Sequence, residues 1–218
     1  QKLYMDMQKL DLTKSSVQDV NNGAYRPLIF TLKLKHKTLF KEQIDSFTLV
    51  FFDTAGEDLN DEDTMNTVNK YICKSAGIIF LLDPMQFPAV RNQLDENTVS
   101  RASSVDWKQA TRSDDIMSRV SKLIRNDRHM KNEQKIDIPV AAVFSKFDAI
   151  APLIPEGSTI LETSPHCNEG VFDMADWHNV DNEIRSLLVE WGAESFISQV
   201  DVNYTNYSYF AVSALGMN

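Results

Sequence analysis

The chain has few cysteines, few glycines and no long apolar runs. Only two of its 218 residues are cysteines and seven are glycines. Cys73 and Cys167 stand outside any CxxC or Cys/His cluster, which disfavours a zinc site and favours a reduced, cytoplasmic protein. No apolar stretch approaches the length of a membrane span, and the amino terminus lacks the apolar core of a signal peptide. The sequence therefore predicts no membrane span.

Positive charge is in the minority. Lys and Arg number 22 against 31 Asp and Glu, a formal net charge of −9. This balance disfavours nucleic acid as a partner, whereas a single nucleotide needs only local positive potential. With 43% hydrophobic residues the chain can bury one substantial core. We therefore expect a single domain over 1–218, with insertions at about 85–110 and 151–173.

The apolar segments predict an α/β fold with a mostly parallel sheet covered by helices. The first two expected strands suit an antiparallel pair separated by the polar stretch 36–46. The run that ends at Asp83 is apolar on both faces, which is typical of a central strand. Strands then alternate with segments of helical periodicity, the order found in α/β proteins. The expected strands cover 27–35, 47–53, 76–83, 138–144 and 207–212, and the expected helices cover 65–76, 113–124 and 180–191.

Polar residues gather where the expected strands end. Because parallel strands direct their carboxyl ends to one edge of a sheet, ligands bind along that edge. The carboxylate of Asp53 could hold a magnesium ion through water, and Gly56 would let the backbone approach a terminal phosphate. Asp83 is expected to cap the turn that follows it, with a position facing the ligand as the alternative. The polar clusters are Asp53–Gly56, Asp83, Ser145–Asp148 and Ser213–Leu215.

Three of these clusters, in this order, resemble the signature blocks of the Ras-like, TRAFAC-class P-loop GTPases. Asp53-Thr-Ala-Gly56 looks like the magnesium and γ-phosphate block. Ser145-Lys-Phe-Asp148 looks like the guanine block, usually Asn/Thr-Lys-x-Asp, and Ser213-Ala-Leu215 like the final Ser-Ala block. The sequence around Asp53 and Asp83 is most similar to that of a group of bacterial TRAFAC-class GTPase domains, including the double-GTPase type. The resemblance covers roughly residues 10–216.

The resemblance implies binding of GTP or GDP together with Mg²⁺. Asp148 would accept the N1 and N2 hydrogens of guanine, the Lys146 stem would lie against the base, and the Ala214 N–H would meet guanine O6. A carboxylate only accepts hydrogen bonds and suits the donor face of guanine, whereas adenine offers no equivalent pair, so a related ATPase is disfavoured. The other base-site residues by resemblance are Ser145, Ser213 and Leu215.

The sequence departs from the family pattern at several positions. Ser145 replaces the usual Asn or Thr, so one bond that braces the guanine loop is expected to be weaker. Glu57 stands where many members carry a glutamine that orients the attacking water, which predicts slow or partner-dependent hydrolysis; an acidic residue at a helix start is the alternative. Thr13 is the candidate for a second magnesium ligand beside Asp53, or else an ordinary loop residue.

No Gly-x-x-x-x-Gly-Lys-Ser/Thr occurs, and the seven glycines are too dispersed to build one. By resemblance, the strand that feeds this loop lies between the strands ending at Asp53 and Asp83, and a last helix follows Leu215. We therefore expect the phosphate loop to lie upstream of Gln1. The alternative is a degenerate fold in which the two flanking strands pair directly. A pseudo-GTPase module, whose insertions bind a protein partner or neighbouring domain, is the competing function.

Overall fold

The computed structural model describes residues 27–37, 42–52, 69–103, 105, 110–166 and 171–214. These residues fall into two compact units, a β-hairpin and an α/β unit that begins at Lys70. None of the helices in these ranges is long and apolar enough to cross a membrane.

The first unit is an antiparallel hairpin of β1 (Leu28–Lys37) and β2 (Glu42–Phe51). The antiparallel pairing expected from the sequence is confirmed, with Leu28 opposite Phe51 and Lys37 opposite Glu42. The expectation that 36–46 forms a polar linker is wrong, because pairing continues through most of it. Ladder bonds join backbone groups, so polar residues can extend a two-stranded ribbon without a core beneath it.

Apolar side chains of the hairpin are exposed. Leu28 and Ile29 are neighbours in the strand, so they point to opposite faces, yet they are 61% and 62% exposed. A two-stranded hairpin is marginally stable by itself. Its apolar surface is therefore suited to contact with further protein. The exposed large apolar residues of this unit are Leu28, Ile29, Phe30, Leu32, Ile44, Phe47, Leu49, Val50, Phe51 and Phe52.

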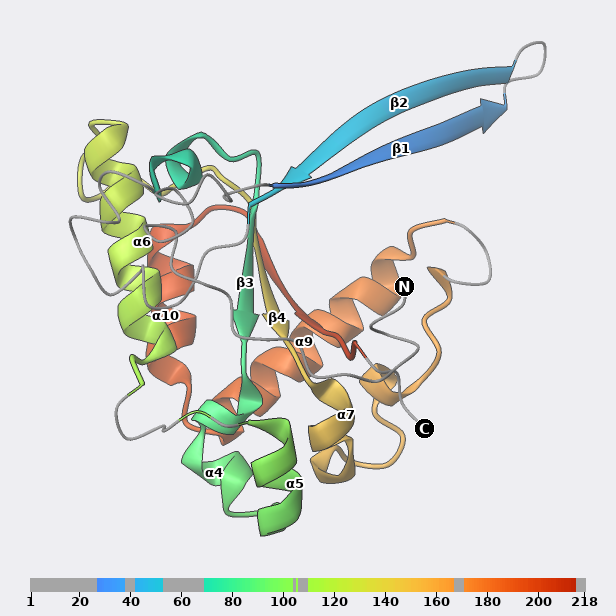
Figure 1. Ribbon diagram of the computed structural model, residues 1–218, viewed down its shortest axis with the longest axis vertical. Coiled ribbons are helices and arrows are strands. Elements are labelled where there is room, and N and C mark those ends of the chain that lie inside the picture. The colour runs from blue at the N-terminus through green and yellow to red at the C-terminus, as the bar shows by residue number, and fades with distance from the viewer. Residues whose placement is uncertain are drawn as a thin grey trace. The chain divides into compact units, whose positions relative to one another are not determined.

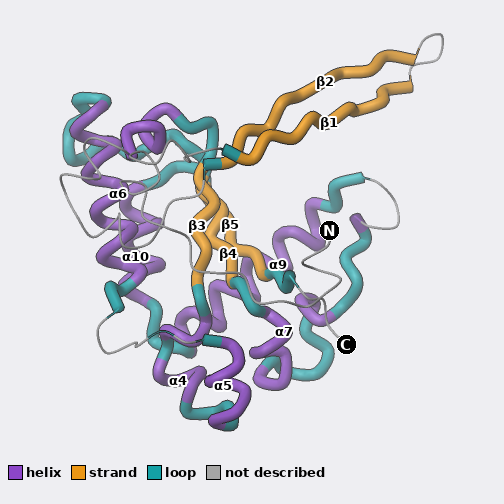
Figure 2. Tube along the Cα trace, viewed as in Figure 1, coloured by secondary structure: helices purple, strands orange, loops and turns teal. Residues whose placement is uncertain are grey.

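The second unit is built on a three-stranded parallel sheet in the order β3–β4–β5. Its strands are β3 (Ile78–Leu82), β4 (Val140–Phe144) and β5 (Tyr207–Ala211), drawn in orange in Figure 2. All three run parallel and in level register. The α/β class and the parallel sheet flanked by helices are thus confirmed. Direct pairing between β2 and β3 is not what the structure shows, since the two strands belong to different sheets.

The expectation that β3 is a central strand is wrong for the described sheet, because β3 lies at an edge. Its two faces differ. Phe80 packs against Phe196 with ring centroids 5.4 Å apart, and Leu82 is buried. Ile79 and Leu81, on the other face, are 56% and 64% exposed. An apolar pattern predicts that a strand is suited to burial, but it does not say which segment covers it.

Helices and short 3₁₀ turns connect the strands. The predicted helices at 113–124 and 180–191 are confirmed, and part of the expected 65–76 helix is a 3₁₀ turn. Both expected insertions contain helical turns. The helix α10 was missed, although Phe196, Ile197 and Val200 have helical spacing and are buried. The elements are η2 (Asn69–Lys74), η3 (Pro84–Gln86), α4 (Pro88–Arg91), α5 (Glu96–Ala102), α6 (Ser113–Asp127), α7 (Phe147–Ile150), η4 (Ala151–Leu153), η5 (Thr159–Leu161), α9 (Met174–Glu190) and α10 (Glu194–Asn203).

The core lies between the sheet and the helices. Helices α6 and α10 lie side by side in Figure 1, and a hydrogen bond of 3.1 Å joins the buried hydroxyls of Ser121 and Tyr204. Phe144 at the end of β4 meets the ring of Trp191 with centroids 5.4 Å apart. Burial of such aromatic side chains contributes much of a domain's stability. It also fixes the end of β4, from which the polar loop 145–148 departs.

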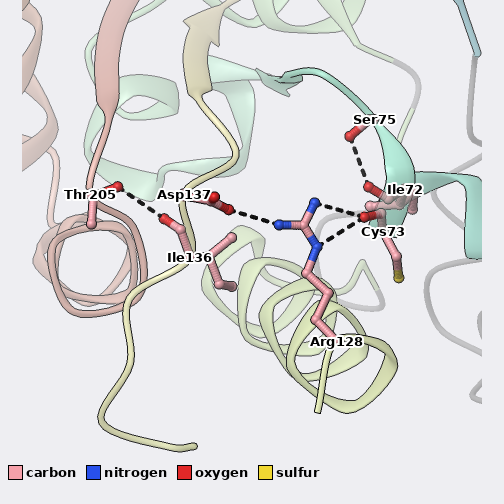
Figure 3. A network of polar contacts seen from close by, with 7 residues as sticks. All are labelled: Ile72, Cys73, Ser75, Arg128, Ile136, Asp137 and Thr205. Carbon is pink, nitrogen blue, oxygen red and sulfur yellow. Dashed lines mark hydrogen bonds and ion pairs between the residues drawn. The ribbon is translucent and has the colours of Figure 1, made fainter. Parts of the chain in front are cut away.

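Arg128, just after α6, joins the segments that precede β3 and β4 (Figure 3). Its guanidinium donates two hydrogen bonds to the Cys73 carbonyl, at 3.1 and 2.9 Å, and a third to Asp137, at 2.7 Å. Thr205, two residues before β5, donates a hydrogen bond from its hydroxyl to the carbonyl of Ile136 at 3.3 Å. Polar contacts therefore brace the amino-terminal edge of the sheet, opposite the edge where the strands end.

Side chains block the outer edge of β5. Tyr209 donates its backbone N–H to the Asp181 carboxylate of α9 at 2.7 Å. The Ser208 hydroxyl donates to the Tyr207 carbonyl at 2.8 Å. An edge strand whose backbone groups are satisfied in this way is a poor template for another strand. The sheet therefore has a blocked edge at β5.

An ion pair beside β5 predicts a pH-dependent contribution to stability. Arg185 donates a hydrogen bond to Asp201 at 3.0 Å and lowers the pKa of that carboxyl below its ordinary 3.8; partial burial opposes the shift and the Tyr207 hydroxyl adds to it. A lowered folded-state pKa gives stability that is present above the unfolded pKa and lost as pH falls through the folded one. The urea-unfolding free energy of Asp201→Asn should thus fall less than that of the wild type between about pH 5 and pH 3. Equal losses would contradict this.

Candidate functional site at the carboxyl edge of the sheet

The three parallel strands bring polar residues to one edge. Leu82, Phe144 and Ala211 end their strands at the same level of the register. Asp83 directly follows β3. The segment 145–148, called loop 145–148, follows β4, and its last two residues, Phe147 and Asp148, begin α7 (Figure 1). The segment after β5 reaches the same edge. Residues that are far apart in the sequence are therefore neighbours here.

Two of the predicted guanine-site blocks meet between β4 and β5. The Ser213 hydroxyl donates to Asp148 Oδ1 at 2.6 Å. Beside this contact, the Phe147 N–H donates to the Val212 carbonyl at 3.1 Å. The Phe147 side chain is buried and fixes the loop between its two polar neighbours. The Asp148 carboxylate is thus oriented both by a side-chain donor and by its backbone.

The other side of the loop is joined to the end of β3. Lys146 Nζ forms an ion pair with Asp83 Oδ2. Ser145 donates to the Leu82 carbonyl from its backbone N–H, at 3.0 Å, and from its hydroxyl, at 3.1 Å. Asp83 Oδ1 accepts the Met85 N–H at 2.9 Å, which confirms the expected turn cap. Loop 145–148 is therefore tied to both neighbouring strands.

Lys146 has a left-handed backbone conformation, with φ 54° and ψ 37°. Among the described non-glycine residues only His129 and Lys146 have positive φ. Such a conformation costs an L-residue about 1–2 kcal/mol, and strain of this kind is found at functional sites when the surroundings impose it. Here the bonds of Ser145 and the buried Phe147 impose it. The conformation starts the side chain on its path toward β3.

The described residues account for half of the predicted site. The structure brings Ser145, Lys146, Asp148, Ser213 and Ala214 to one edge. Within the described ranges, no group of three or more His, Cys, Asp or Glu residues could hold a metal ion. The magnesium, phosphate and hydrolysis assignments thus stay predictions. The residues outside the described ranges are Thr13, Asp53, Gly56, Glu57 and Leu215.

Sequence reasoning missed the pairing of Asp83 with Lys146. The sequence predicted a capping role for Asp83, and Oδ1 has that role in the structure. It did not predict the contact of Oδ2 with Lys146. The available signal was that both residues follow neighbouring parallel strands, whose ends share an edge. The left-handed conformation of Lys146 had no such signal, because lysine does not favour it.

A surface hollow of about 500 Å³ lies elsewhere, between α9 and residues 205–208, which lead into and begin β5. Its charged residues are already engaged: Asp181 accepts the Tyr209 N–H, and Arg185 pairs with Asp201. None of the predicted site residues lines it. The carboxyl edge therefore remains the better candidate for the site.

The carboxyl edge can recognise a flat, donor-bearing ring. Ser213 occupies one lone pair of Asp148 Oδ1, and each carboxylate oxygen has two, so Asp148 can still accept a pair of parallel N–H donors. The Lys146 stem runs from the end of β4 to Asp83 at the end of β3 and is an apolar stretch on the same edge of the sheet. A carboxylate and an apolar surface together suit a nitrogenous base.

The Ser213–Asp148 bond should make a measurable contribution to stability. Ser213→Ala removes the donor and should lower the urea-unfolding free energy by about 1 kcal/mol. Asp148→Asn keeps an oxygen acceptor and should change it by less than about 0.5 kcal/mol, so this variant is the matched control. In a double-mutant cycle, Ser213→Ala and Asp148→Ala should be non-additive. Additive losses would show that the two side chains do not interact.

Comparisons with known proteins do not assign the chain to a family. No protein-family model matches it, and neither a curated protein nor a solved structure matches it. A functional proposal for this chain is therefore carried by its own residues: the parallel sheet, the loop after β4 and the polar contacts at the carboxyl edge.

Proposed function

We propose that this chain is part of a guanine-nucleotide-binding switch that hydrolyses GTP with Mg²⁺. The phosphate loop would be supplied by sequence upstream of Gln1. Asp148 would accept the two donors of guanine, the Lys146 stem would pack on the base, and Ala214 would offer its N–H to guanine O6. Positioning and electrostatic stabilisation supply most of the catalysis in such enzymes.

The observation that carries the proposal is the contact between Ser213 and Asp148. Each block resembles a GTPase signature by itself, and Asp148 and Ser213 are 65 residues apart in the sequence. Their meeting at the carboxyl edge of parallel strands puts an oriented carboxylate where α/β proteins bind ligands. An acceptor-only carboxylate at this edge supports the proposal that Asp148 recognises guanine.

The outer edge of β3 supports the idea of a further strand. The Ile78 N–H and the Leu82 C=O bond toward β4, so the backbone groups of Ile79 and Leu81 direct away from it. Within the described residues no strand pairs with that side of β3. Exposed apolar side chains and an unpaired edge are costly for a strand. A strand leading into a phosphate loop would pair with this edge and satisfy its backbone groups.

The phosphate side of the proposed site lies outside the described ranges. There Asp53 and Thr13 would hold Mg²⁺, which neutralises charge on the phosphates when bound. Gly56 would approach the γ-phosphate with its N–H. Glu57 would orient the attacking water, and its negative charge beside the phosphate would make hydrolysis slow or dependent on a partner.

A second candidate function is a nucleotide-independent module that binds a protein partner. The exposed apolar residues of the hairpin, among them Leu28 and Ile29, favour it. Apolar patches of this kind mark interaction surfaces. The upstream sequence distinguishes the two candidates: a Gly-x-x-x-x-Gly-Lys-Ser/Thr there supports the switch, and its absence supports the module.

The guanine claim predicts a change of base specificity. Guanine presents two donors to Asp148, whereas xanthine presents one donor and one acceptor in the same positions. Asp148→Asn replaces two acceptors with one acceptor and one donor, so a longer polypeptide with the phosphate loop should lose about 100-fold or more in GTP affinity and gain affinity for xanthosine triphosphate. Calorimetric titration with both nucleotides measures this.

Mg²⁺-ATP is the control ligand for the wild-type polypeptide. Equal affinities for GTP and ATP would contradict specific recognition of guanine. Binding of neither nucleotide would contradict the proposed switch function. Because Asp148→Asn preserves the acceptor for Ser213, a loss of GTP binding by this variant would reflect recognition of the base rather than unfolding. An unchanged preference for GTP in the variant would contradict the role of Asp148.

The 218-residue chain by itself should bind nucleotide weakly or undetectably. Phosphate loops and their lysine provide many of the contacts to the phosphates, and this sequence contains no such loop. Titration of the chain with Mg²⁺-GTP should show no saturation in the micromolar range. A dissociation constant of about 1 μM or tighter would contradict the proposed division of the site.

A further inference from the structure

We propose that Asp83 is a positioning residue that holds Lys146 across the carboxyl ends of β3 and β4, so that Lys146 presents its stem rather than its charge to the ligand. This inference rests on the proposed function for its ligand. It adds a residue outside the three signature blocks, one that would fix the packing position already proposed for the Lys146 stem.

The geometry divides the two oxygens of Asp83 between two tasks. Oδ1 accepts the Met85 N–H and caps the turn after β3, while Oδ2 pairs with Lys146 Nζ. Met85 is fully buried, so the cap fixes the carboxylate on a rigid part of the core. The Asp83 carboxylate is therefore fixed in place, and it holds the lysine ammonium at one position.

Stability alone does not account for this arrangement. The Lys146 and Asp83 side chains are 36% and 20% exposed, and ion pairs in such settings contribute little. The left-handed backbone of Lys146 is itself unfavourable. A strained backbone joined to a weak ion pair is the pattern expected where geometry serves a ligand.

The position of the pair defines what Lys146 can do. Asp148 is bonded toward β5 and Lys146 toward β3, so the lysine stem spans the ends of β4 and β3 along the edge that carries Asp148. A base held by Asp148 would lie against this stem. A free carboxylate on the β3 side would repel phosphates that extend there, and the ammonium neutralises it. Each charge of the pair thus cancels the other.

A variant cycle tests this in the longer polypeptide that carries the phosphate loop. Asp83→Asn keeps the turn cap but releases the lysine, and we expect GTP binding to weaken about three- to thirty-fold. Lys146→Met keeps an apolar stem but leaves Asp83 unpaired, and about a tenfold loss is expected. The double variant should bind more tightly than Lys146→Met, because it restores neutrality. Asp137→Asn, a change to an exposed carboxylate at the opposite edge, is the matched control and should bind as the wild type does.

Nuclear magnetic resonance of the Lys146 side-chain ammonium gives a readout that needs no nucleotide. In the 218-residue chain, Asp83→Asn should shift the Lys146 ¹⁵Nζ signal or broaden it by faster hydrogen exchange, and Asp137→Asn should leave it unchanged. An unmoved Lys146 signal in Asp83→Asn would overturn the positioning role. So would additive affinity losses in the cycle, which would show that Asp83 and Lys146 act independently.

The two proposals fail separately. If the longer polypeptide binds no nucleotide while the Lys146 signal responds to Asp83→Asn, the GTPase function falls and the positioning contact stands. If nucleotide binds and Asp83→Asn weakens it equally with and without Lys146→Met, Asp83 acts independently of Lys146 and the positioning role falls.

Discussion

The parallel, level register of β3, β4 and β5 is the constraint on which the rest of the structure depends. It places Leu82, Phe144 and Ala211 side by side, so the residues that follow them share one edge. An antiparallel arrangement would send Asp83 and Ser213 to opposite ends of the strands from the loop after β4. The contacts to Asp148 and Lys146 exist only because the three strands run the same way.

The loop after β4 is rigid because bonds hold it from two directions. Ser145 and Lys146 are bonded toward β3, while Phe147 and Asp148 are bonded toward β5. Between them the Phe147 ring is buried in the core. A recognition carboxylate gains affinity when its geometry exists before the ligand arrives, because less freedom is then lost on binding. The loop has this preorganised character in its described contacts.

Much of the fold could be predicted from apolar patterns, because burial needs periodic apolar residues. The runs before Asp83 and Phe144 predicted β3 and β4. The missed helix α10 carried a usable signal in Phe196 and Val200, but it is short and follows another helix closely. The edge position of β3 could not be predicted, since a strand's sequence specifies its suitability for burial and not its neighbours.

The candidate site was predictable to the extent that its residues follow strands. Strand ends at one edge implied that Asp148 and Ser213 would approach each other, and they do. The Asp83–Lys146 pair depends on a left-handed lysine, a backbone state that the residue type does not favour. Tertiary contacts impose that state, so a sequence pattern could not reveal it.

The carboxylate of Asp181 on the β5 edge has a consequence for how copies of the three-stranded sheet can associate. A sheet with two open edges can add neighbours on both sides, and such growth continues into a filament. Here Asp181 terminates one side, because the Tyr209 N–H is already satisfied. The β5 edge therefore cannot take part in such growth, and a further strand, from this polypeptide or from another copy, would join the described sheet at β3.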